Sequence, residues 1–103
     1  MIYEFNGYKP VVDPSSFVHK EATIIGNVII GQNVYIGPGA SLRGDWGQII
    51  VKDGCNVQDN CIIHIFPGKD VILEENSVKL NKLFIFNSYS GSDWFKENAY
   101  LNV

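Results

Sequence analysis

The apolar residues in the first part of the chain recur at every sixth position. From residue 18 onward this position is aliphatic in five consecutive repeats: Val18, Ile24, Ile30, Ile36 and Leu42. Four positions after each of the first four lies a small or apolar residue: Ala22, Val28, Val34 and Ala40. In the last repeat this position holds the large residue Trp46. An α-helix needs apolar spacings near three and four, and a half-buried strand needs a spacing of two. Alternating spacings of four and two instead predict a short strand and a turn, repeated along the chain.

The six-residue frame continues beyond two insertions of three residues each. It resumes after Leu42 with three aliphatic residues, and two cysteines hold the small position between them: Val51, Val57, Ile63, Cys55 and Cys61. We predict that the frame then reaches Ile72, nine residues after Ile63. β-branched residues at 23–25 and 28–30 favour strands, and Gly31 and Gly37 mark corners.

Stacked repeats of this kind bury one continuous column of aliphatic side chains, which predicts an all-β fold, a parallel β-helix. We expect about three coils over residues 10–77, with positions 18 apart lying above one another. Val18 would then lie next to Ile36, and Ile24 next to Leu42. A β-sandwich with regular turns is the alternative. The winding direction does not follow from these residues.

Composition and charge narrow the function classes. The 103 residues carry a net charge of −3 and contain no basic cluster, which argues against nucleic acid as a partner. No apolar run approaches the roughly 20 residues of a spanning helix, and the first residues lack the features of a secretory signal. Cys55 and Cys61 make no disulfide framework. We expect no membrane association and a cytoplasmic location.

Three stretches carry a family resemblance: residues 41–45 (Ser-Leu-Arg-Gly-Asp), residues 51–54 (Val-Lys-Asp-Gly), and residues 56–61 followed by His64. With them the chain resembles the γ-class carbonic anhydrase-like branch of the hexapeptide-repeat proteins, and within it the phenylacetate-degradation and carnitine-operon members. The resemblance covers residues 1 to about 77. It implies a left-handed β-helix, a homotrimer, and zinc or another divalent metal held between subunits by three histidines. Members hydrate carbon dioxide, or hydrolyse or transfer acyl-CoA thioesters.

The resemblance assigns roles to five residues. His64 matches the first metal-binding histidine, Arg43 and Asp45 match the charged pair at the subunit interface, and Gln58 and Asp59 match the pair that positions the metal-bound water. Without the family, Arg43 and Asp45 form a simple ion pair, and Gln58 and Asp59 satisfy backbone groups at a corner. Cys55 and Cys61 are expected to pack inside rather than to act as nucleophiles.

The two remaining metal positions of the family fall on Leu80 and Ile85, which cannot bind a metal. The other histidine of the chain, His19, lies at the first repeat, several coils from His64 by the stacking rule. We therefore expect a catalytically incomplete chain that binds no metal. Two alternatives stand: an acyltransferase that uses acyl-CoA and a histidine base, or a non-catalytic β-helical fragment. Its expected partners are further copies of itself and a small anion or acyl-CoA.

Residues 78–103 leave the frame and are rich in aromatic residues. Short strands are expected near residues 78–80 and 83–86, and a short helix over residues 94–101. One interpretation is a lid that covers the open edge of the β-helix, since uncovered edges aggregate. The other is a truncated or frame-shifted family member, with residues 1–77 as its β-helix and residues 78–103 as a foreign tail.

Overall fold

The computed structural model describes residues 1–79 and the backbone of residues 83–86. Seven strands form one sheet: β1 (Ile2–Tyr3), β2 (Val11–Val12), β4 (Thr23–Ile30), β6 (Ser41–Val51), β8 (Ile62–Ile65), β9 (Asp70–Leu73) and β11 (Leu83–Phe86). Four form a second: β3 (Phe17–Val18), β5 (Tyr35–Ile36), β7 (Asn56–Val57) and β10 (Val78–Lys79). The two strands expected beyond residue 77 are thus present. The expected helix and aromatic lid lie outside the described residues.

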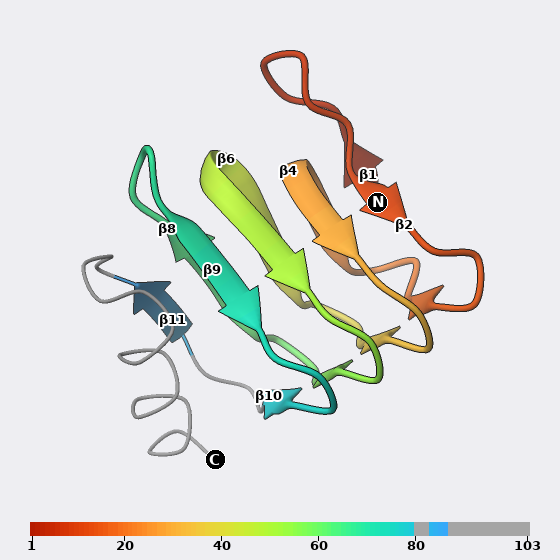
Figure 1. Cartoon of the computed structure of the whole chain (residues 1–103). Helices are drawn as coiled ribbons and strands as arrows, with labels where there is room; N and C mark the ends of the chain where they lie inside the picture. Colours follow the sequence, from red (N-terminus) through yellow and green to blue (C-terminus); the bar gives the residue numbers. More distant parts are fainter. Residues whose placement is uncertain (80–82, 87–103) are drawn as a thin grey trace.

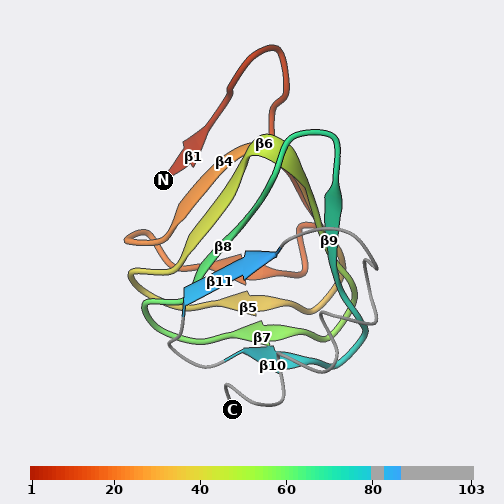
Figure 2. The same cartoon turned by 90° about the vertical axis from the view of Figure 1, so that its left-hand side faces the viewer.

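The strands wind around three sides of a parallel β-helix. Every pairing between the eleven strands is parallel. The long strand β4 bends at a register shift between Gly26 and Val28, so that β1 pairs with its first half and β2 with its second. β6 pairs in the same way with β8 and then β9. Figure 2 shows the resulting three-sided outline. The predicted parallel β-helix is confirmed, and the sandwich is excluded.

Coils follow one another along the axis of the β-helix from β1 at one end to β11 at the other (Figure 1). The second sheet has four strands, so the chain passes that side four times. About three coils were expected over residues 10–77. The fourth pass is β10, which lies just beyond those residues and pairs with β7.

The predicted inward column is buried. Val18 pairs with Ile36 and Ile24 pairs with Leu42, which confirms the stacking of positions 18 apart. After the first insertion the step becomes 21, as between Leu42 and Ile63. The predicted core residues other than Val18 are almost fully buried, and Val18 packs against them. Cys55 and Cys61 are buried, as expected for the small position.

The frame beyond Ile63 was predicted wrongly by one residue. Val71 and Leu73 face the core, and Ile72 between them faces outward. The reason is the length of the loop after β8: Val51 pairs with Leu73, 22 positions later, instead of the 21 that separate Ile30 from Val51. One additional residue in a strand connection moves every following side chain to the opposite face.

This shift also sets the last buried position among the side chains that the structure describes. Lys79 pairs with Val57 and is only 4% exposed, so a lysine occupies the column that holds valine or isoleucine in earlier coils. Burial lowers its pKa from the usual 10.5, because the low-dielectric interior disfavours the charged form.

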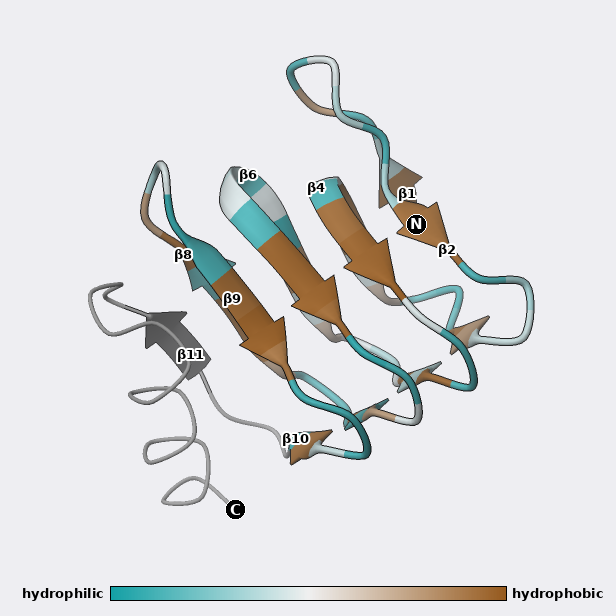
Figure 3. Ribbon diagram, in the orientation of Figure 1, coloured by the Kyte–Doolittle hydropathy of each residue, from teal (hydrophilic) through white to brown (hydrophobic). Residues whose placement is uncertain are grey.

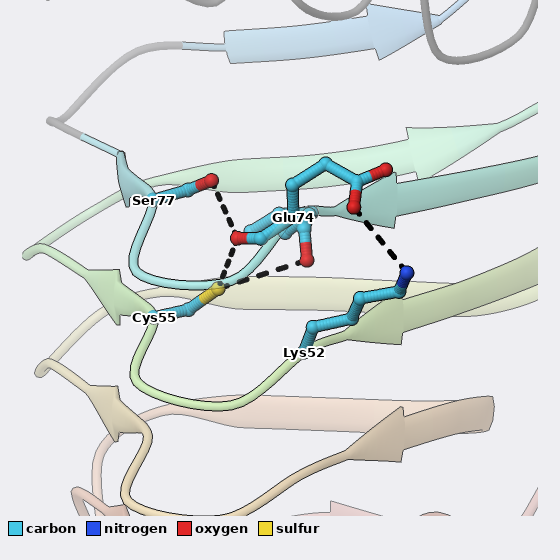
Figure 4. A network of polar contacts seen from close by, with 5 residues as sticks. Lys52, Cys55, Glu74 and Ser77 are labelled. Carbon is cyan, nitrogen blue, oxygen red and sulfur yellow. Dashed lines mark hydrogen bonds and ion pairs between the residues drawn. The ribbon is translucent and has the colours of Figure 1, made fainter.

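Corners are held by polar contacts between successive coils. Figure 4 shows Glu74, whose carboxylate pairs with Lys52 at 3.3 Å. The Glu74 carbonyl accepts hydrogen bonds from the Cys55 thiol at 3.0 Å and from the Ser77 hydroxyl at 2.6 Å. At another corner Gly39 has a φ of +76°, and a Cβ there would lie 2.1 Å from Oδ1 of Asn60. Glycine is therefore required at that position.

Candidate functional site

Arg43 and His64 are direct neighbours on adjacent coils. Strand β6 pairs with β8 so that Arg43 lies opposite His64 and Leu42 lies opposite Ile63. Because Leu42 and Ile63 face the core, the alternation of strand side chains turns Arg43 and His64 outward. Two residues 21 positions apart thus share one outer face of the β-helix.

Asp45 completes this group. Its Oδ2 atom accepts hydrogen bonds from Nη2 of Arg43 at 3.1 Å and from Nε at 3.4 Å. The Asp45 side chain is 16% exposed and that of Arg43 is 40% exposed. Gly44 between them lets β6 approach the β4 corner, since a Cβ there would lie 2.5 Å from the carbonyl oxygen of Asn27. An ion pair with one exposed partner stabilises the fold by about 0–1 kcal/mol.

The surroundings of His64 favour its neutral form. Burial lowers the pKa of the imidazole below 6.5, and the positive charge of Arg43 lowers it further. The carboxylate of Asp45 acts in the opposite direction and does not reverse the shift. The buried atoms Nδ1 of His64 and Oδ1 of Asp45 have no hydrogen-bond partner among the described residues. A neutral imidazole is the form that binds metals or accepts a proton.

Gln58 and Asp59 lie at a different corner of the same chain. They follow β7 and precede β8, whereas Arg43 and Asp45 lie where β6 turns into the next side. The Gln58 side-chain amide donates a hydrogen bond to Oδ1 of Asn56. The Asp59 carboxylate lies against Gly37 of the preceding coil, where a Cβ would be 2.6 Å from Oδ1. A single chain therefore brings together Arg43, Asp45 and His64 but leaves Gln58 and Asp59 apart.

A zinc site of the type implied by the resemblance does not fit these residues. In the described part of the chain no group of three histidine, cysteine, aspartate or glutamate side chains lies close enough to hold a metal. His19 is engaged elsewhere, because its Nδ1 accepts a hydrogen bond from the backbone of Glu21 at 3.0 Å. The backbone of Ile85 pairs with that of His64, and Leu80 lies outside the described residues. Zinc sites require three or four protein ligands, and His64 supplies one.

Sequence reasoning missed two features near these residues. Asn56, the partner of Gln58, lies in the 56–61 stretch that carries the resemblance but was given no role of its own, although its spacing of two from Gln58 was a usable signal. The corner beside Asp45 also contains a cavity whose walls come from four separate segments of the chain. Among the described residues no helix is long and apolar enough to span a membrane.

The chain is similar in sequence to a known protein family and to two curated proteins. Residues 9–44 match the family model described as bacterial transferase hexapeptide (six repeats). The chain is 53% identical over 75 residues to the carnitine operon protein CaiE of Proteus sp. (strain LE138), which covers 73% of this chain and 38% of that protein. It is 55% identical over 74 residues to CaiE of Escherichia coli O157:H7, covering 72% and 38%.

A solved structure agrees with the fold. The crystal structure of a hexapeptide transferase family protein from Anaplasma phagocytophilum matches with a TM-score of 0.77 and 32% identity. The match covers 82% of this chain and 50% of that chain. The chain spans 38% of the length of the curated relatives described above. These matches confirm the resemblance that the motifs indicated.

Proposed function

Because this chain belongs to the hexapeptide-repeat family, we propose that it is one subunit of a homotrimer that binds a small anion at the Arg43–His64 face without zinc. The anion is a carboxylate or a phosphate group of an acyl-CoA thioester. The observation that carries the proposal is the pairing of the half-exposed Arg43 with a neutral imidazole on the next coil. Among the described residues Nη1 of Arg43 has no acceptor, so part of the guanidinium is available for a planar anion.

An outward apolar stripe supports the assembly of copies. Val11, Ile29, Ile50 and Ile72 lie opposite one another in register on four successive strands. Figure 3 shows that β2 and the second halves of β4, β6 and β9 consist largely of hydrophobic residues. Val11 and Ile29 are exposed in a single chain, and contiguous exposed apolar surface is typical of protein–protein interfaces. Assembly would also bring Gln58 and Asp59 of one copy toward the Arg43–His64 face of another.

The proposed site works without the family's metal. The chain contains two histidines, and positions 80 and 85 hold leucine and isoleucine, so each trimer site would receive one matched imidazole. We therefore propose that the chain binds no zinc tightly and does not hydrate carbon dioxide. This catalytic incompleteness is also what the hypothesis of a truncated or frame-shifted family member predicts.

Acyl transfer from acyl-CoA is the second candidate, and the neutral state of His64 favours it. In this reaction His64 would remove the proton of an acceptor hydroxyl or amine while its oxygen or nitrogen attacks the thioester carbonyl carbon. The carbon–sulfur bond then breaks, and the leaving thiolate of CoA takes the proton back from the imidazolium. Neutral imidazole is the form that such a general base requires.

One set of measurements separates these possibilities. We expect a trimer mass in native mass spectrometry, no stoichiometric zinc in elemental analysis, and binding of CoA or bicarbonate that is lost in Arg43→Gln. Lys52→Gln is the matched control, because it also removes a cation from an ion pair, the exposed Lys52–Glu74 pair. A monomeric mass would contradict the assembly. Stoichiometric zinc that is lost in His64→Ala would contradict the metal-free site. Turnover of acetyl-CoA that is lost in His64→Ala without any zinc would favour acyl transfer.

A further inference from the structure

A cavity of about 340 Å³ lies at one corner of the β-helix, next to the Arg43–His64 face, with which it shares Asp45. Its walls come from the turn between β1 and β2, the bend of β6, and the loop between β8 and β9, and Asn27 of the β4 bend also contributes. All three segments project from the same side of the molecule, at the top of both Figure 1 and Figure 2. The residues that give the cavity its chemistry are Phe5, Tyr8, Asp45, Trp46, Lys69 and Asp70.

Three exposed aromatic rings line this cavity. Phe5, Tyr8 and Trp46 are 46%, 54% and 53% exposed. The first two are held at the ends of a tight turn by two reciprocal backbone hydrogen bonds of 2.9 Å. Trp46 stacks on Phe66 of the next coil, with ring centroids 6.3 Å apart. Three positioned rings around one hollow form a surface that attracts organic cations through their π faces.

Charged groups of both signs accompany the rings. Asp45 and Asp70 contribute carboxylates, and Lys69 contributes one ammonium group. Arg43 occupies only Oδ2 of Asp45, whereas the buried Oδ1 has no donor among the described residues. This atom is too buried for a ligand to contact, but burial leaves the negative charge of the Asp45 carboxylate poorly screened, so the cavity wall attracts a cation.

We propose that the cavity binds a small zwitterion that carries an aliphatic ammonium group and a carboxylate, the chemistry of amino acids. The ammonium group lies against the aromatic rings and the carboxylates of Asp45 and Asp70. The ligand's carboxylate pairs with Lys69. A neutral sugar would use the rings but not the two opposite charges. This site is additional to the anion site proposed above, and the two share Asp45, which pairs with Arg43.

The test uses three probes of equal length with the full chain. 4-Aminobutyrate carries both charges, butylamine carries only the ammonium group, and pentanoate carries only the carboxylate. In isothermal titration calorimetry we expect 4-aminobutyrate to bind at least about tenfold more tightly than either comparator, because each ionic contact is then made. Equal affinities of the three probes would overturn the proposal, and so would the absence of 4-aminobutyrate binding at millimolar concentration.

Variants locate the binding within the molecule. Trp46→Leu and Asp70→Asn are each expected to weaken 4-aminobutyrate binding about tenfold, since each removes one contact of the ammonium group. Phe17→Leu is the matched control, because Phe17 is also exposed and stacked, on Tyr35 at 5.6 Å, but lies on a different side. Circular dichroism melting confirms that each variant is folded. Equal losses in Trp46→Leu and Phe17→Leu would contradict binding at this corner.

Discussion

The one-residue shift after β8 makes Ile72 and Leu73 a sensitive pair for testing the packing of the β-helix. Leu73 is fully buried and pairs with Val51, while Ile72 pairs with Ile50 on the outer face. In a register shifted by one residue, Ile72 would face inward and Leu73 outward. The two registers therefore predict opposite effects of Ile72→Ala and Leu73→Ala on the free energy of unfolding.

The expected magnitudes follow from burial. Leu73→Ala removes a fully enclosed side chain and leaves a cavity, which costs about 2–5 kcal/mol in free energy of unfolding. Ile72→Ala shortens an outward side chain in a single chain and should cost less than about 1 kcal/mol. Folded domains of this size are stable by about 5–15 kcal/mol, so both variants should fold, with Leu73→Ala clearly weakened.

Thermal unfolding followed by circular dichroism measures this difference. The comparison is made at several protein concentrations, since Ile72 lies in the proposed interface between copies. We expect Leu73→Ala to melt at least about 4 °C below Ile72→Ala, because the two costs differ by at least about 1 kcal/mol and a loss of 1 kcal/mol lowers the melting temperature of a small domain by roughly 4 °C or more. A larger loss in Ile72→Ala at low concentration would refute the register described here.

Three further predictions test the core, a close backbone approach and the buried lysine. Ile36→Asp should unfold the chain, because an unpaired charge in the central column is very costly; a melting temperature within a degree or two of the parent would show that the side chain is not inward. Gly47→Ala should destabilise by about 1–3 kcal/mol in urea unfolding, since its Cβ would lie 2.3 Å from the carbonyl oxygen of Lys69; an unchanged midpoint would contradict this approach. Burial lowers the pKa of Lys79 in the folded chain, so the unfolded chain binds more protons between that value and 10.5, and this group makes stability rise with pH in that window. Burial raises the pKa of Cys55, which has the opposite effect on the pH dependence of stability. The measurement therefore compares Lys79→Met with the parent, and the rise in stability with pH should be missing in Lys79→Met.

The sequence by itself determined the architecture. An apolar residue at every sixth position satisfies neither a helix nor a flat sheet, and only stacked coils place all of these side chains inside. The spacing of 18 between Val18 and Ile36 followed directly from three repeats in each coil, and the structure has the same pairing. The same frame set Arg43 and His64 on one outer face, because each follows an inward residue.

Only the tertiary structure decided the features that arise outside the periodic frame. Nothing in the sequence of residues 66–69 shows whether the loop adds three positions or four, yet this one residue turns Leu73 and Lys79 inward and Ile72 outward. The separation of Gln58 from His64 likewise depends on which corner each turn occupies.

The cavity at the β6 corner shows why such features cannot be predicted from the sequence alone. Phe5 lies in the turn after β1, Trp46 at the bend of β6 and Lys69 in the loop before β9, and they meet only because successive coils stack with their corners aligned. Periodic burial of apolar side chains is a local rule that a sequence displays directly. Contacts between loops depend instead on the path of the backbone around each corner, which short irregular segments do not encode in any repeat.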